Sequence, residues 1–151
     1  MSDETLIDAD AAEAMRAAGR RRVELKQAVS AVEIAAARAA AEPGWAANLM
    51  AELKDLETAL EQHTDEVEGP NGLLTELAAD VPRLIHRIDA VKNEHPTLLD
   101  QAGMVIAAVR DDQEPDDIRA VVLDLLVAIA RHRQKGSDLV YDAYNVDIGG
   151  G

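Results

Sequence analysis

Three histidines of this 151-residue chain, His63, His95 and His132, could bind a metal ion together. Each falls on the apolar stripe of a separate amphipathic segment, and in a helical bundle such stripes face one another across the core. Imidazole nitrogens that converge from different helices are ligands that zinc and iron accept. Whether the three histidines can form such a site depends on the helices that carry them.

Apolar residues recur at steps of three and four along most of the chain, which is the period of a helix that buries one face. No segment has the alternating pattern of a strand. The expected helices are Val23–Ala41, a second opened by Pro43, a third with Asp80 as its N-cap, and a fourth opened by Pro115. Each of the last three carries one of these three histidines. We therefore expect an all-α fold, namely an antiparallel four-helix bundle with up-down-up-down topology.

The position of each histidine relative to the turns indicates whether the three share one level. His95 and His132 lie at nearly equal distances from the turn that joins their helices, so they differ by ~3 Å in height along the bundle. His63 reaches the same level if the Gly-Pro-Asn-Gly segment at 69–72 is a kink and the second helix resumes to Ala79. If that segment is instead the turn, His63 lies near one end. We favour the kink, which places all three imidazoles in one layer.

The composition indicates one domain and excludes several classes of protein. A hydrophobic content of 48% is enough for a core, and its side chains must be mostly aliphatic because the chain has no Phe, one Trp and two Tyr. The absence of Cys excludes disulfides and thiolate chemistry. The net charge of −14 argues against a nucleic-acid partner, and no apolar run approaches the ~20 residues that cross a membrane. The acidic N-terminus is unlike a signal peptide, so we expect a cytoplasmic protein.

Three parts are expected along the chain. Residues 1–22 are an N-terminal arm or helix extension, residues 23–145 form the bundle, and residues 146–151 are a Gly-rich tail. The arm ends in a basic cluster, Arg20-Arg21-Arg22, which we expect to be solvated or paired within the chain.

Short motifs around the histidines resemble those of hemerythrin-like (HHE cation-binding) domains. An acidic stretch and then Gly-Pro-Asn-Gly-Leu-Leu follow His63, the segment Glu94-His95-Pro96-Thr97-Leu98-Leu99 resembles the EHxxLL signature, and His132 falls late in the last helix. The resemblance spans roughly residues 23–144. It implies a four-helix bundle that holds two non-haem irons through about five histidines and two carboxylates, for oxygen binding, sensing or iron handling.

The chain departs from that family pattern at most of the ligand positions. No histidine is present in the first helix, and Val67 stands where the second helix should carry a carboxylate, which leaves Glu66 or Glu68 as displaced substitutes. His95 has apolar residues four positions away on either side, where the family has a second histidine. A complete di-iron ligand set cannot be assembled from these residues.

Two hypotheses for the function stay open. In the first, the chain is a hemerythrin-like binding or sensing module in which His63, His95 and His132, with Glu66 or Glu68, hold one iron or zinc ion. In the second, the bundle holds no metal and acts as a structural or interaction domain, with another protein or a second copy of the chain as partner. No paired carboxylates or activated nucleophile suited to catalysis are visible, so we do not expect an enzyme.

Overall fold

The computed structural model describes residues 25–149 of the chain, and side chains as far as residue 145. Within this range the chain forms helices and turns only. The helices are a first one over residues 25–37, then α2 (Trp45–Glu68), α3 (Leu73–Asp80), the 3₁₀ turn η1 (Pro82–Leu84), α4 (Ile85–Arg110) and α5 (Pro115–Gly149). The expected arm of residues 1–22 lies outside the described residues, and the tail expected from residue 146 is helical as far as Gly149.

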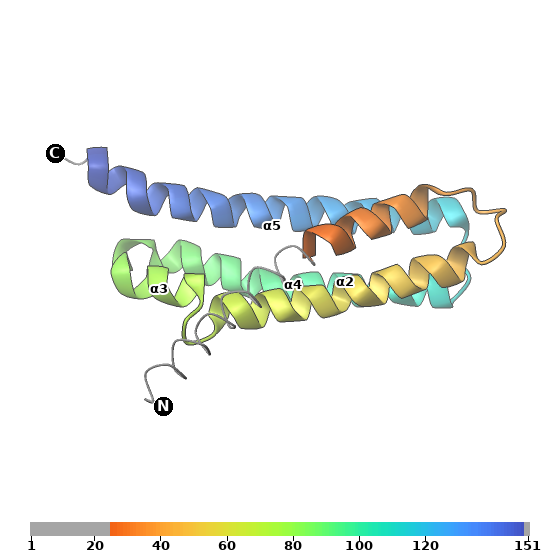
Figure 1. Ribbon diagram of the computed structural model, residues 1–151, viewed down its shortest axis with the longest axis horizontal. Coiled ribbons are helices and arrows are strands. Elements are labelled where there is room, and N and C mark those ends of the chain that lie inside the picture. The colour runs from red at the N-terminus through yellow and green to blue at the C-terminus, as the bar shows by residue number, and fades with distance from the viewer. Residues whose placement is uncertain (1–24, 150–151) are drawn as a thin grey trace, which may run out of the picture.

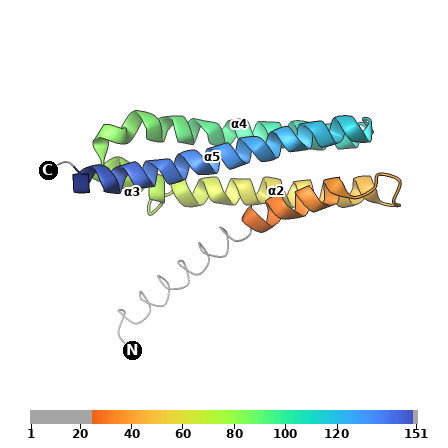
Figure 2. The ribbon, with the colours of Figure 1, turned by 90° about the horizontal axis from the view of Figure 1, so that it is seen from above.

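The four long helices lie side by side along the long axis of the molecule, and the chain reverses direction from each one to the next (Figure 1, Figure 2). α4 packs against both α2 and α5. Helix 25–37 lies beside only one half of the bundle, next to the turn into α2, whereas α3 lies at the opposite end (Figure 1). The expected all-α four-helix bundle is thus confirmed for the described part of the chain.

Arg119 of α5 ties the end of the first helix to the bundle. Its guanidinium donates hydrogen bonds of 2.9 Å each to the carbonyl oxygens of Ala36 and Arg38, at the end of a helix where carbonyls lack intrahelical partners. The same guanidinium lies 5.2 Å from the centre of the buried Trp45 ring, at the start of α2. One side chain therefore joins three helices at this end.

The starts of α2 and α5 agree with the sequence to different degrees. α5 begins at Pro115, as expected. α2 begins at Trp45 rather than at Pro43, because Gly44 adopts a left-handed conformation with φ 80° that turns the chain before the helix.

The expected N-cap at Asp80 is wrong. Asp80 is the last residue of α3, and the N–H of Val81 donates a 2.8 Å hydrogen bond back to the carbonyl oxygen of Leu77. Pro82, which has no N–H to donate, then opens η1 before α4. Asp80, which the sequence predicted to cap the next helix, thus belongs to the short helix α3.

The expected kink after His63 is a complete break in the helix at residues 69–72. The Thr75 hydroxyl lies 3.1 Å and 2.8 Å from the carbonyl oxygens of Glu68 and Gly69, which it satisfies at the end of α2. Gly72 is required here, because a side chain would collide with the carbonyl of Val67. After this break α3 continues toward the same end of the bundle (Figure 1).

The buried apolar side chains form two clusters separated by the histidines. The larger cluster contains fully buried residues such as Leu53 and Leu125, and the smaller one gathers α3 and the adjoining parts of α4 and α5. Each histidine lies between the two clusters on its own helix: His63 between Leu60 and Val67, His95 between Leu98 and Val91, and His132 between Ile129 and Leu139. None of the described helices is long and apolar enough to cross a membrane.

Candidate metal centre

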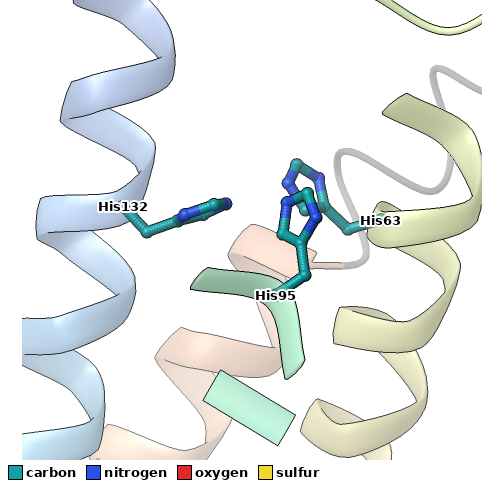
Figure 3. Close-up of side chains that lie close together, drawn as sticks. All are labelled: His63, His95 and His132. Carbon is teal, nitrogen blue, oxygen red and sulfur yellow. The ribbon is translucent and has the colours of Figure 1, made fainter. Parts of the chain in front are cut away.

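The three histidines meet in the core of the bundle, as their spacing predicts. His63 comes from α2, His95 from α4 and His132 from α5, and their rings point toward one another (Figure 3). One ring nitrogen from each lies within 4.8 Å of the others. The ring centres are 4.7 to 5.7 Å apart, and the rings meet edge to face. Three helices therefore bring one imidazole nitrogen each to within 4.8 Å of the others.

Burial makes this cluster chemically demanding. The residues His95 and His132 are 3% and 5% exposed, and they are the only polar or charged residues among the buried ones that the structure describes. His95 Nε2 is buried and has no hydrogen-bond partner within residues 25–149. A buried polar atom without a partner costs about 1–3 kcal/mol. A ligand that engages this nitrogen would remove that cost.

Two carboxylates fix the orientation of the two buried rings. His95 Nδ1 donates a 2.9 Å hydrogen bond to Glu68 Oε2, and His132 Nδ1 donates a 2.9 Å hydrogen bond to Glu94 Oε1. An ionised carboxylate only accepts, so the proton of each neutral ring resides on Nδ1. In a neutral ring held in this way, Nε2 carries a lone pair, which is the form that binds a metal ion.

Glu94 also forms an ion pair with Lys135 of α5. Burial, the largest single effect, raises the pKa of Glu94. The hydrogen bonds of Lys135 and His132, the positive charge of Lys135 and that of His132 when its ring is protonated outweigh burial and hold that pKa below its usual value. For His132, burial is the largest effect and lowers the pKa, and the hydrogen bond to Glu94 opposes it only in part. The His132 ring is therefore neutral at neutral pH, as a metal ligand must be.

The two glutamates expected near the site take different places. Glu68 accepts a hydrogen bond from Nδ1 of His95, so it lies behind that ring. Glu66 lines the pocket beside the three histidines, and both of its carboxylate oxygens are buried. The fourth histidine, His86 of α4, is exposed and lies outside the cluster.

The supporting roles of Glu94 and Lys135 were missed from the sequence. A signal was present, because Glu94 directly precedes His95 and Lys135 follows His132 by three residues, about one helical turn. Which of these neighbours faces another helix depends on the rotation of each helix about its axis. Periodicity alone does not determine that rotation to within one residue.

A pocket of about 270 Å³ opens beside the histidines. Three kinds of residue line it: the histidines with Glu66, the polar or small residues Arg133, Gly136 and Ser137 of α5, and the apolar residues Leu25, Val67, Leu73, Leu74, Val91 and Val140. The cluster is thus reached from a defined cavity on one side.

Comparisons with protein-family models, with curated proteins and with solved structures found nothing that matches this chain. The arguments about function therefore depend on the geometry of the described residues.

Proposed function

We propose that the protein is a binding module that holds one divalent transition-metal ion, zinc or iron, through His63, His95 and His132. The observation that carries the proposal is the convergence of three ring nitrogens within 4.8 Å, two of them on rings oriented by a carboxylate. Carboxylate–imidazole–metal arrangements are the usual second shell of histidine metal sites.

The chemistry of the donor set favours zinc or iron over hard cations. Three neutral imidazoles suit borderline metals, whereas calcium and magnesium prefer oxygen ligands. Bonds from zinc to imidazole are ~2.0–2.1 Å long, so binding requires the nitrogens to approach more closely than their present 4.8 Å limit, by rotation of the side chains. The fourth position is open to the Glu66 carboxylate or to a ligand from the pocket.

The number of ligands supports one ion rather than two. The resemblance to hemerythrin-like domains agrees with a metal in the core of a bundle, but three histidines are fewer than a di-iron centre uses. Because α2, α4 and α5 each supply one ligand, a bound ion links three helices and stabilises the folded chain. Such a module responds to metal by a change in stability.

Metal analysis of the purified protein tests this proposal. We expect about one zinc or iron ion per chain after reconstitution, and loss of that ion in His63→Ala, His95→Ala and His132→Ala. His86→Ala is the matched control, because His86 lies on α4 but is exposed and outside the cluster. Circular dichroism would show that the variants remain helical. Equal, near-zero metal in the wild type and in the triple variant would overturn the proposal.

A further inference from the structure

We infer that the pocket beside the histidines binds a medium-chain monocarboxylate, whose carboxylate contacts the metal ion and Arg133 and whose hydrocarbon chain extends toward α3. This inference rests on the proposed function, because the ion supplies one of the two positive charges. It goes beyond the proposed function because it names a class of organic ligand, whereas the proposed function concerns only the metal ion.

The lining of the pocket changes from polar to apolar along the bundle axis. On α5, His132 and Arg133 lie at one level, Gly136 and Ser137 in the middle, and Val140 at the other level, about 12 Å from His132 by the rise of a helix. α4 runs the opposite way, and its Val91 precedes His95, so it too is apolar toward α3.

The third wall of the pocket has the same polarity. His63 and Glu66 of α2 come first along the chain, then Val67, and then Leu73 and Leu74 at the start of α3. On α2, α4 and α5 the histidines and Arg133 thus lie at one end and aliphatic side chains at the other. Glu66 lies beside Val67 and Ser137 lies in the middle, whereas Leu25 of the first helix adds an apolar side chain from the larger cluster. A ligand that matches both ends has a charged head and an apolar tail.

The charge at the polar end favours an anionic head. A divalent ion and Arg133 outweigh the single carboxylate of Glu66 in the pocket wall. The Glu68 and Glu94 carboxylates lie against the outer nitrogens of His95 and His132, and Lys135 offsets one of these two further negative charges. The ion, Arg133 and Lys135 together still outweigh the three carboxylates. A carboxylate that binds the ion can also accept a charge-assisted hydrogen bond from the guanidinium.

Gly136 keeps the middle of the pocket open. It lies four residues after His132 and four before Val140, so all three share one face of α5. Glycine weakens a helix relative to alanine, and nothing lies within 4 Å of the position that a Cβ would take. The glycine is therefore not explained by close packing. Its missing side chain leaves room between the metal site and the apolar end.

Calorimetric titration of the zinc-loaded protein with octanoate tests the inference. We expect octanoate to bind more tightly than butyrate, which lacks the tail, and more tightly than octanol, which lacks the charge. Metal-free protein should bind octanoate at least tenfold more weakly. Equal binding of octanoate and octanol, or equal binding with and without zinc, would overturn the inference.

Matched variants separate the pocket from the rest of the protein. Gly136→Leu should weaken octanoate binding at least tenfold while zinc binding is retained, and the milder Gly136→Ala should weaken it less. Gly103→Leu is the control, because Gly103 lies inside α4 with equally open space for a Cβ but outside the pocket. Equal weakening by the Gly103 and Gly136 variants would contradict the inference.

The charge contact has its own pair of variants. Arg133→Gln should weaken octanoate binding about tenfold, the effect of losing one charge-assisted hydrogen bond. Arg131→Gln should not, because Arg131 is exposed on the other side of His132 and does not line the pocket. Zinc binding, measured separately in every variant, distinguishes the two proposals. Zinc bound without octanoate leaves the proposed function standing and ends this inference, whereas no zinc bound ends both.

Discussion

The two carboxylates behind the histidines provide the sharpest test of the candidate metal centre. Glu68→Gln and Glu94→Gln keep the shape of each side chain and remove its negative charge. A glutamine can still accept the hydrogen bond from Nδ1, so the ring keeps its orientation but becomes a weaker base. The change in metal affinity then measures how much the carboxylate charge strengthens metal binding by the adjacent histidine.

The expected size of this effect follows from the burial of the pairs. Loss of an outer partner of a metal-bound histidine weakens binding by about 10–100-fold, or about 1.4–2.8 kcal/mol. The side chains of Glu68 and Glu94 are 31% and 27% exposed, so water already screens part of their charge. We therefore expect each single variant to bind zinc about tenfold more weakly, which is the lower end of that range. Because Glu68 and Glu94 contact different histidines, their effects should multiply, and the double variant should bind zinc about a hundredfold more weakly.

A competition titration of zinc against a colorimetric chelator measures these affinities. Glu61→Gln on α2 and Asp89→Asn on α4 are the controls, because each removes an exposed carboxylate from a helix that carries a ligand. They account for the general effect of net charge on zinc affinity. If Glu68→Gln and Glu94→Gln bind zinc no more weakly than these controls, the two carboxylates do not support metal ligands and the reasoning fails.

Three further predictions concern the stability of the metal-free protein. His95→Leu removes the buried Nε2 but also the hydrogen bond to Glu68, so it is measured in a Glu68→Leu background, where it should raise the free energy of unfolding in urea by about 1 kcal/mol and abolish zinc binding; a lower stability in that background would show that His95 is satisfied. Acidification from about pH 7 to 5 should destabilise the fold. His132 lies among Glu94, Lys135 and the other two histidines, and burial lowers its pKa in the folded chain, so the unfolded chain takes up a proton at a higher pH than the folded chain does. The pH dependence of the melting temperature should weaken in His132→Gln, and an unchanged dependence would contradict this assignment. Leu53→Ala in the larger cluster should cost about 2–5 kcal/mol, whereas Leu123→Ala, at a site 61% exposed, should change stability by less than about 0.5 kcal/mol in the same urea titration.

The helices and the histidine layer could be predicted from the sequence because both depend on periodicity. A histidine that replaces a leucine in a three-and-four pattern must lie on the buried face, and the common rise of the helices then sets its height. The end of α3 could not be predicted in this way. Asp80 has the composition of an N-cap, yet the hydrogen bond from Val81 to Leu77 keeps it in the preceding helix.

The partners of the histidines were also beyond prediction from periodicity. Glu66 and Glu68 are two residues apart on α2, and both were candidate ligands. Only the rotation of α2 determines that Glu68 reaches the outer nitrogen of His95 while Glu66 lines the pocket. A hydrogen bond needs an accuracy of a few tenths of an ångström, and this accuracy comes from packing between helices that are far apart in sequence.

The position of the histidines between the two apolar clusters bears on how the molecule unfolds. Cooperative unfolding requires that the two halves share contacts, and here the layer that joins them consists of imidazoles rather than aliphatic side chains. We expect that, without an ion, α3 and the adjoining ends of α4 and α5 open while the larger cluster stays folded, so that their amide protons exchange through a local event. An ion bound to α2, α4 and α5 makes the opening of either half break a metal–ligand bond. With an ion bound, His63, His95 and His132 would thus make the two parts of the bundle unfold as one cooperative unit.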